Sequence, residues 1–156
     1  MSATDAALLT EYRQIGTSTW SDVLDEIGIE GVVGGLVRRS GAGRFAGFAV
    51  TAKAKAGPLG SFKREAFAVG QMIDAVGPGE VLAIDVGGAE VSTFGGLASL
   101  ATKIRGVAAV VIDGACRDAE KYAKPVCGWP AATSRPDRER SASMWSISVN
   151  RSPSAA

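Results

Sequence analysis

The chain has 156 residues, of which 46% are apolar and 21% charged, and its formal net charge is +1. These values predict one globular domain with a sizeable core, and the charge gives no electrostatic argument for a nucleic-acid partner or an acidic membrane. The apolar runs are far shorter than the roughly 20 residues of a spanning helix, and residues 1–5 lack the features of a secretion signal. We therefore expect a cytoplasmic protein.

The amino-acid content also limits the chemistry, because the chain contains no histidine. This excludes Ser-His-Asp and Cys-His nucleophile systems and zinc sites that use histidine. Cys116 and Cys127 are too few for a cysteine-based zinc site, and a disulfide between them is disfavoured in a reducing compartment. A metal in this protein would bind through oxygen ligands, which favours Mg²⁺, Mn²⁺ or Ca²⁺.

The first half of the chain is predicted to begin with helices. The expected elements are a helix over 6–15, a helix over 20–27, a glycine-rich loop over 31–44, a strand over 45–54 and a helix over 62–73. Thr4 and Gly16 are a plausible N-cap and stop for the first helix. Thr19 and Asp22 resemble a capping box for the second helix, and Gly28 is expected to end it.

The middle of the chain predicts a strand–helix–strand unit. The expected order is a turn at 77–79, a strand over 80–86, a helix over 97–105 closed by Gly106, and a continuous apolar strand over 107–112. Such a unit places its two strands parallel and adjacent. The fold class is therefore predicted to be α/β.

Two loops follow these strands and are expected to lie side by side, because ligands bind beyond the carboxyl ends of parallel strands. The first loop, 87–96, ends in Gly95-Gly96 at a helix N-terminus, where free N–H groups favour an anion. The second loop, 113–118, presents Arg117, which can grip a carboxylate, and Asp118, which can hold a hard cation. Together these groups suit a 2-oxo acid whose enolate a metal would stabilise.

Each of these residues also has a structural interpretation. Asp118 could cap a short helix that ends before Pro125, and Arg117 could pair with Glu120 on the surface. The two glycines could form a plain turn between strand and helix. Elsewhere, Asp85 is either functional or a paired structural carboxylate, and lysines such as Lys53 are usually solvated.

Several blocks of sequence occur in an order that carries a family resemblance. They are Thr19–Leu24 (TWSDVL), Gly47–Thr51 (GFAVT), Pro78–Leu82 (PGEVL), Phe94–Ala98 (FGGLA), Gly106-Val107 before the apolar strand, and Asp113–Asp118 (DGACRD). In this order they resemble the family of the regulator of ribonuclease activity A (RraA) and the 4-hydroxy-4-methyl-2-oxoglutarate aldolases. The last block resembles the family's D-G-x-x-R-D motif.

The resemblance implies a β/β/α sandwich similar to the swivelling phosphohistidine domain, assembled as trimers or dimers of trimers. It implies a class II aldolase that uses Mg²⁺ or Mn²⁺ to cleave 4-hydroxy-4-methyl-2-oxoglutarate or 4-carboxy-4-hydroxy-2-oxoadipate, and that also decarboxylates oxaloacetate. By this resemblance Arg117 would bind the pyruvoyl carboxylate and Asp118 would hold the metal. The substrate would contact Gly95, Gly96, Leu97 and Ala98.

Two alternatives to a metal-dependent aldolase are considered, a non-catalytic regulator and a Schiff-base aldolase that uses a lysine. Some members of the family bind ribonuclease E and inhibit it without known catalysis, so a non-catalytic regulator is the alternative. Other members carry a menaquinone methyltransferase label, for which this sequence shows no cofactor loop. A Schiff-base aldolase is disfavoured because no lysine lies in a convincing apolar pocket pattern.

The sequence departs from the family pattern at several positions. Gly96 stands where many of the aldolases have Glu, and Lys121 stands where the family often has an acid. The resemblance covers about residues 8–127, and the family usually continues into further strands. We therefore expect a domain over 1–127 that lacks its C-terminal part and a divergent, poorly ordered tail over 128–156, which a shifted reading frame or a truncated gene would explain.

Overall fold

The computed structural model describes residues 3–67, 69–118, 131–133 and 144–151. Its helices are α1 (Ala3–Gln14), α2 (Thr17–Glu26), the 3₁₀ helix η1 (Arg64–Ala66), α3 (Val69–Ala75) and α4 (Gly96–Ile104). Its strands are β1 (Val37–Ser40), β2 (Ala49–Gly57), β3 (Val81–Asp85), β4 (Ser92–Phe94), β5 (Ala109–Asp113), β6 (Ala115–Cys116), β7 (Ala131–Thr133) and β8 (Met144–Arg151). None of the helices in these ranges is long and apolar enough to cross a bilayer.

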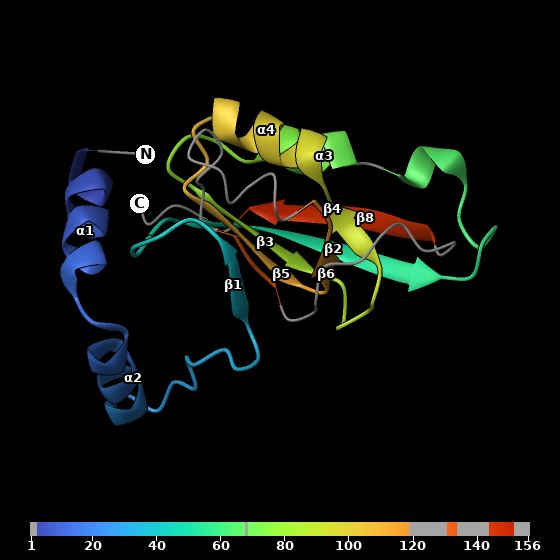
Figure 1. The fold of residues 1–156 in the computed structure, drawn as a ribbon. Helices are drawn as coiled ribbons and strands as arrows, with labels where there is room; N and C mark the ends of the chain where they lie inside the picture. Colours follow the sequence, from blue (N-terminus) through green and yellow to red (C-terminus); the bar gives the residue numbers. More distant parts are fainter. Residues whose placement is uncertain (1–2, 68, 119–130, 134–143, 152–156) are drawn as a thin grey trace.

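A six-stranded sheet with the order β1-β7-β5-β3-β2-β8 forms the centre of the molecule (Figure 1). Strands β2, β3, β5 and β7 run parallel, whereas β1 and β8 pair antiparallel at the two edges. The parallel pairing of β3 with β5 aligns Asp85 with Asp113 at the ends of the two strands. The predicted α/β class and the predicted adjacent, parallel strands are both confirmed.

One face of this sheet is buried beneath α3 and α4, which lie on the same side of it in Figure 1. Along β2, Val50, Ala52 and Ala54 are buried, while Thr51 and Lys53 between them are exposed. This alternation is what a half-buried strand requires, since successive side chains point to opposite faces. The core cluster comprises Val50, Ala52, Ala54, Met72, Val76, Leu82, Ile84, Val86, Phe94, Ala98, Val107, Val110, Ile112 and Cys116.

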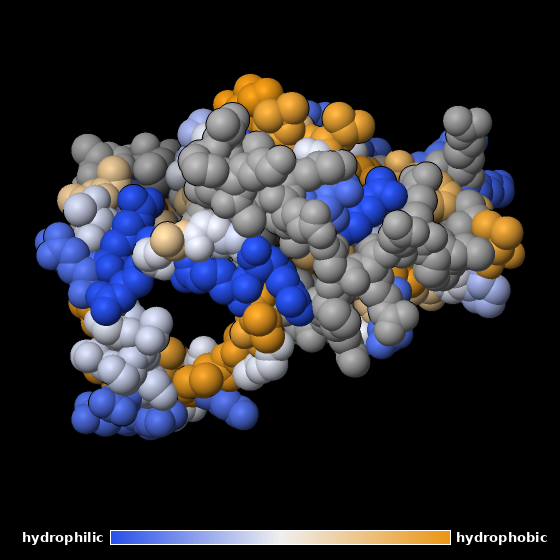
Figure 2. Space-filling view, in the orientation of Figure 1, coloured by the Kyte–Doolittle hydropathy of each residue, from blue (hydrophilic) through white to orange (hydrophobic). Residues whose placement is uncertain are grey.

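The outward side of α4 carries an exposed apolar stripe. Leu97, Leu100 and Ile104 are 86%, 48% and 76% exposed, and the hydrophobic colour gathers over this helix in Figure 2. These residues follow a helical spacing that places them along one face. An apolar face of this kind marks a surface that a partner can cover.

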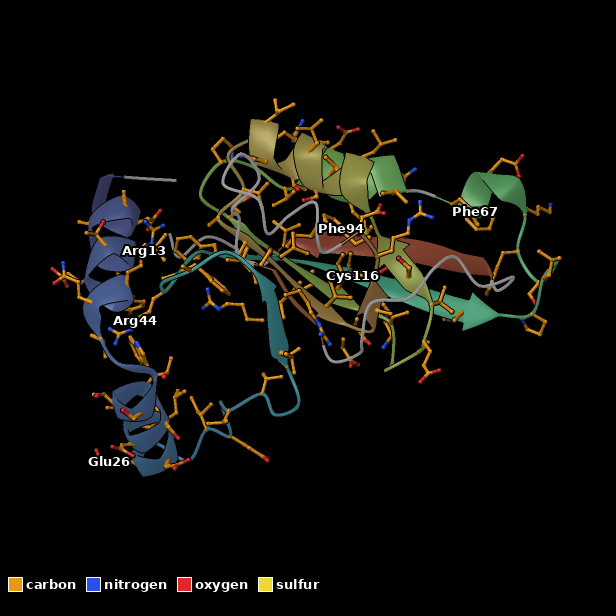
Figure 3. All side chains as sticks on the ribbon, in the orientation of Figure 1. Arg13, Glu26, Arg44, Phe67, Phe94 and Cys116 are labelled. Carbon is orange, nitrogen blue, oxygen red and sulfur yellow. The ribbon has the colours of Figure 1, made fainter. Side chains whose placement is uncertain are left out.

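A small second sheet pairs β4 with β6 in parallel, although the sequence predicted loops for both segments. Phe94 is the register partner of Cys116, and both side chains are buried in the core (Figure 3). Ser92 and Thr93 of β4 are buried as well. The loops that leave β3 and β5 are therefore joined by backbone pairing, which local sequence patterns do not reveal because the partners are distant in sequence.

The predicted turns of the central unit are confirmed. Gly79 has φ +76°, and the N–H of Glu80 donates to the carbonyl of Gly77 at 3.3 Å, as a type II turn requires. Gly106 has φ +73° directly after α4, where the left-handed conformation ends a helix and favours glycine. Local signals therefore located this unit well.

The N-terminal elements differ more from their predictions. The capping box is wrong, because α2 begins at Thr17 and Thr19 lies inside it. Its N-cap residue is Gly16, which makes no side-chain cap hydrogen bond. The end of the helix is confirmed, since Gly28 has φ +71° just beyond it. The glycine-rich segment predicted as loop includes β1, and the helix predicted over 62–73 divides into η1 and α3.

The prediction of a poorly ordered tail is wrong for residues 131–133 and 144–151, which form β7 and β8. The eight residues of β8 pair with β2 from Val50↔Arg151 to Gly57↔Met144. β7 lies between β1 and β5. Sheet edges supply hydrogen-bond partners that sequence periodicity does not show. The remainder of the predicted tail, and Cys127 before it, lie outside the described residues.

Candidate functional site

The two predicted loops meet beyond the ends of β3 and β5. The backbone N–H of Arg117 donates to the carbonyl of Phe94 at 3.0 Å, which extends the pairing of β4 with β6. The backbone N–H of Gly96 donates to Oδ2 of Asp118 at 2.9 Å. The predicted contact between the glycine pair and the Arg-Asp pair is thus present in the fold.

Asp118 provides the cap for the N-terminus of α4. Gly95, the N-cap residue of this helix, has no side chain that could satisfy the first N–H groups. The Asp118 carboxylate accepts from one of them and places a negative charge near the positive end of the helix dipole. The anion position predicted there is therefore partly filled by the protein itself. The alternative cap before Pro125 lies outside the described residues.

Asp118 has an uncommon backbone conformation, with φ +62°. Asp and Asn enter this left-handed region more readily than other non-glycine residues, at a cost of about 1–3 kcal/mol. Such a conformation persists where the surrounding structure holds it, and the bond to Gly96 is one such restraint. Residues in this conformation concentrate at functional sites, which favours a role for Asp118 beyond the helix cap.

Gly95 allows the two loops to approach closely. A Cβ atom at this position would lie 2.7 Å from Nε and 3.2 Å from Cγ of Arg117, and 3.4 Å from Oδ2 of Asp118. Real side chains essentially never make contacts as short as the first, so a larger residue would displace Arg117. The observed position of Arg117 therefore depends on glycine at position 95, which a plain turn would not explain.

Arg117 and Asp118 are partly accessible. Their side chains are 42% and 31% exposed, and Nε of Arg117 lies 4.0 Å from Oδ2 of Asp118. Of the other predicted substrate contacts, Ala98 is buried in the core whereas Leu97 points outward. The groups offered to a small ligand here are the guanidinium, the carboxylate, and the backbone of Gly95 and Gly96.

The donor set is compatible with Mg²⁺ or Mn²⁺ held mainly by water and substrate. Mg²⁺ usually keeps several waters and takes one or two carboxylates from the protein. Asp118 supplies one carboxylate, and the Gly96 N–H that it accepts fixes its orientation. Within the described ranges no three Asp, Glu or Cys side chains gather into a set that could hold a metal. The described residues therefore fit an open site and do not build a closed cage.

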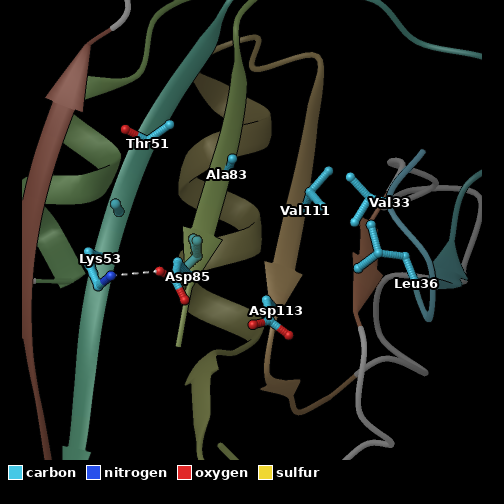
Figure 4. A pocket seen from close by; sticks show the side chains of 10 residues that line it. Val33, Leu36, Thr51, Lys53, Ala83, Asp85, Val111 and Asp113 are labelled. Carbon is cyan, nitrogen blue, oxygen red and sulfur yellow. Dashed lines mark ion pairs between the residues drawn. The ribbon is translucent and has the colours of Figure 1, made fainter. Parts of the chain in front are cut away.

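A row of charged residues runs across β2, β3 and β5 on the sheet face opposite α3 and α4 (Figure 4), at the ends of β3 and β5 and in the middle of β2. Nζ of Lys53 lies 3.2 Å from Oδ2 of Asp85, and the Gly87 N–H donates to Oδ1 of Asp85 at 2.8 Å. That N–H, and then Lys53, hold the pKa of Asp85 below its usual value. With Asp113, these side chains line a cavity of about 410 Å³.

This row bears on two residues whose roles the sequence left open. Asp85 is a paired carboxylate, and Lys53, although 67% exposed, is its ion-pair partner. Sequence reasoning did not connect them because Lys53 and Asp85 lie on different strands. Asp85 is the last residue of β3 whereas Lys53 lies in the middle of β2, so only the strand register places them side by side.

Family membership follows from a family model described as RraA-like, Aldolase/RraA, which matches residues 17–150 of the chain. The chain belongs to this family. The match extends across the boundary predicted at residue 127, in agreement with the presence of β7 and β8 in the main sheet. No curated protein matches the chain at a significant level.

Solved structures share the fold at low sequence identity. A crystal structure described as novel cellulases from microbes of the gut ecosystem has a TM-score of 0.78 at 22% identity, with 92% of this chain and 64% of that chain covered. Streptomyces coelicolor RraAS2, described as an unusual member of the RNase ES inhibitor RraA family, has a TM-score of 0.73 at 24% identity, with 86% and 65% covered.

The RNA-processing inhibitor RraA from Thermus thermophilis has a TM-score of 0.64 at 23% identity, with 81% of this chain and 71% of that chain covered. At these identities the likenesses establish the fold alone. This chain spans less than two thirds of the length of the first two structures named above.

Proposed function

We propose that the protein is a divalent-metal-dependent aldolase and decarboxylase that acts on a small 2-oxo acid in the cytoplasm. The substrate would be of the 4-hydroxy-4-methyl-2-oxoglutarate or 4-carboxy-4-hydroxy-2-oxoadipate type, with oxaloacetate decarboxylated as well. The observation that carries the proposal is that Arg117 and Asp118 lie together at the N-terminus of α4. The Gly96 N–H donates to Asp118 there. Membership of a family described as Aldolase/RraA supports it.

In this proposal the chain's own residues bind and orient the substrate. The Arg117 guanidinium would grip the carboxylate next to the keto group through two parallel N–H donors. The positive end of α4 would favour the same negative charge. Because Gly95 has no side chain, Arg117 can pack close to it, which places the guanidinium near the N-terminus of α4. These groups would hold the substrate in one orientation while its carbon–carbon bond breaks.

Asp118 would hold the metal, Mg²⁺ or Mn²⁺, with water and substrate oxygens as the other ligands. A carboxylate has two oxygens with about four acceptor positions, so the bond from Gly96 to Oδ2 orients Asp118 without using its full capacity. When bound, the metal would supply Lewis-acid polarisation of the keto oxygen.

Assembly as a homotrimer, or as a dimer of trimers, is part of the same proposal. The exposed apolar stripe of Leu97, Leu100 and Ile104 supports it, because a monomer would leave this face of α4 in water. Light scattering at micromolar concentration tests the assembly. A stable, well-folded monomer would argue against it.

Pyruvate release from oxaloacetate, measured with and without EDTA, tests the enzymatic proposal. Turnover should require Mg²⁺ or Mn²⁺ and should be restored when the metal is returned. Asp74→Asn is a matched control, since Asp74 is 81% exposed and pairs with Arg105, away from the residues of the site. This variant should retain turnover, whereas Asp118→Asn should lose it. Metal-independent turnover would contradict the proposal.

The alternative function is a non-catalytic regulator that binds a ribonuclease E-like partner. The fold likeness to two proteins described as ribonuclease or RNA-processing inhibitors favours it. Purified ribonuclease E cleaving a short RNA in the presence of this protein provides the test. Inhibition of cleavage, together with no pyruvate release under any metal, would support the regulator over the enzyme.

A further inference from the structure

A second concave site lies where the N-terminal helices meet the sheet. Its walls come from α1, α2, β1 and the segment just before β2, and its volume is about 400 Å³. This lies within the range typical of small-molecule pockets. The residues that characterise it are Tyr12, Trp20, Phe45, Arg38 and Arg44. It shares no lining residue with the Arg117–Asp118 site or with the Lys53–Asp85 cavity.

The aromatic residues give this pocket flat apolar surfaces. The rings of Tyr12 and Trp20 pack edge to face, with centroids 4.7 Å apart and planes at 73°. This arrangement is a favoured geometry for aromatic pairs and holds both rings in place. Trp20 and Phe45 are half-buried, so part of each ring remains accessible. A planar ligand can stack against such surfaces.

Two guanidinium groups give the pocket a positive charge. Nη2 of Arg38 donates to the carbonyl of Gly43 at 2.7 Å, and Nη1 of Arg44 donates to the carbonyl of Gln14 at 2.9 Å. A guanidinium has five N–H donors, so each group retains donors for a ligand. Neither arginine forms an ion pair with a carboxylate in the described part of the chain. The positive charge of the pocket is therefore not neutralised by those carboxylates.

Two hydrogen bonds join α1 to the segment before β2 beside this pocket. Arg44 donates to Gln14 of α1, and Arg13 of α1 donates through Nη2 to the carbonyl of Ala46 at 3.1 Å. Figure 3 shows both arginines at the junction between α1 and the segment before β2. These bonds fix α1 against that segment and restrain the Arg44 guanidinium, which lowers the entropic cost of binding a ligand.

We propose that this pocket binds a small planar anion, meaning an aromatic ring that carries a carboxylate or a phosphate. Both anions match the fork of N–H donors that arginine presents. The ring would stack on Trp20 and Phe45 while Arg38 and Arg44 hold the anionic group. A neutral aromatic would leave the guanidinium groups without a counter-charge, and an inorganic anion would leave the rings uncovered.

Calorimetric titration of the purified protein tests this assignment with four probes. Phenyl phosphate and benzoate carry both features, inorganic phosphate carries only the anion, and benzyl alcohol carries only the ring. The stronger of the two aromatic anions should bind at least about 10-fold more tightly than inorganic phosphate or benzyl alcohol, because each lacks one set of contacts. The comparison of phenyl phosphate with benzoate identifies the anionic group. Equal affinity for benzyl alcohol, or no heat from either aromatic anion, would overturn the proposal.

A pair of arginine variants locates the binding. Arg38→Gln removes a guanidinium that lines the pocket, and its affinity for the tighter aromatic anion should fall about 10-fold, the loss expected for one charge-assisted hydrogen bond. Arg105→Gln is the matched control, because Arg105 also donates to backbone carbonyls, those of Val76 and Asp74, but neither lines the pocket nor contacts the elements that form it. Its affinity should stay within about 2-fold of the parent protein. Unchanged affinity in Arg38→Gln, or an equal loss in Arg105→Gln, would contradict the assignment.

Discussion

The N-terminal helices and the β3–α4–β5 unit differ in how much of their apolar surface the fold buries. Within the described part of the chain α2 buries no residue, and α1 buries Leu9 alone among its described side chains. By contrast α4 buries Ala98, Ser99 and Thr102 on its inner side. α2 and α4 are both amphipathic, so amphipathicity alone does not determine burial. What distinguishes them is the position of α4 over a sheet whose strands present their apolar side chains to it.

The two regions are also held in place differently. The N-terminal helices are joined to the body by hydrogen bonds from Arg13 and Arg44 to backbone carbonyls. The central unit is held by strand pairing, by its core and by the cap that Asp118 provides for α4. The candidate catalytic residues belong to the region held by strand pairing and core packing, which suits precise positioning. The proposed anion pocket belongs to the more exposed one.

The largest expected effect comes from Asp118, which caps α4 and is also the proposed metal ligand. Asp118→Ala should lower metal-dependent turnover more than about 100-fold, because it removes the proposed metal ligand together with the cap. Asp118→Asn should keep the fold, since Asn caps a helix about as well as Asp, and should still lose turnover. Oxaloacetate decarboxylation and calorimetric Mn²⁺ titration measure both effects. Unchanged Mn²⁺ affinity in the Asn variant would move the metal elsewhere, with Asp85, Glu90 and Asp113 as the next candidates.

The contrast in burial predicts a contrast in stability. Leu82→Ala, at a fully buried position of β3, should lower the free energy of unfolding by about 2–5 kcal/mol through lost burial and a residual cavity. Val23→Ala, on α2 where Val23 is 43% exposed, should change it by less than about 0.5 kcal/mol. Urea denaturation compares the two variants. A cost at Val23 equal to that at Leu82 would show that the N-terminal helices are covered in solution, for instance by another copy.

Gly95 tests the close approach of the two loops. Gly95→Ala should cost about 1–3 kcal/mol of stability or displace Arg117, because the new Cβ would lie 2.7 Å from its Nε. Gly34→Ala is the matched control, since a Cβ there meets nothing within 4 Å and its φ is not in the left-handed region. Thermal unfolding and the KM for oxaloacetate are the measurements. Equal effects at the two glycines would show that Arg117 does not pack against Gly95.

Arg117→Lys is expected to act on substrate binding rather than on the metal. Lysine keeps the charge but loses the two-pronged contact, so the KM for oxaloacetate should rise about 10-fold, and kcat should also fall if the fork orients the substrate. Mn²⁺ affinity should remain nearly that of the parent protein. A KM that does not change would remove Arg117 from the proposed carboxylate site.

The smallest effect concerns the Lys53–Asp85 pair. Because the pKa of Asp85 is lowered, its contribution to stability is present above the usual value of 3.8 and is lost as the pH falls through the lower pKa of the folded state. The pair is half-exposed, so Asp85→Asn should cost less than about 1 kcal/mol at neutral pH. Urea denaturation between pH 7 and pH 3 follows this loss. If the free energy of unfolding of Asp85→Asn falls with pH as steeply as that of the parent protein, Asp85 does not contribute to the loss of stability in acid.

Much of the central unit could be predicted from the sequence, because its signals are local. Gly79 and Gly106 mark a turn and a helix end through their left-handed conformations, and the apolar run before Asp113 indicates a buried strand. The meeting of the two loops also followed from the sequence, since neighbouring parallel strands end at the same edge. The residue types at the candidate site were therefore identifiable before the fold was known.

Only the tertiary structure decided how distant residues combine. The bond from Gly96 to Asp118 spans 22 positions, and the pair of Lys53 with Asp85 depends on the register of β2 with β3. The sequence at 144–151 (MWSISVNR) does alternate apolar and polar residues, a local strand signal that the predicted tail left out. The pairing of this segment with β2, and of 131–133 with β1 and β5, depends on neighbours that are distant in the sequence. The arginine and aromatic pocket likewise exists only when α1 packs beside the segment before β2. Propensity and spacing act over a few residues, whereas these contacts are set by strand order and register, which no local pattern contains.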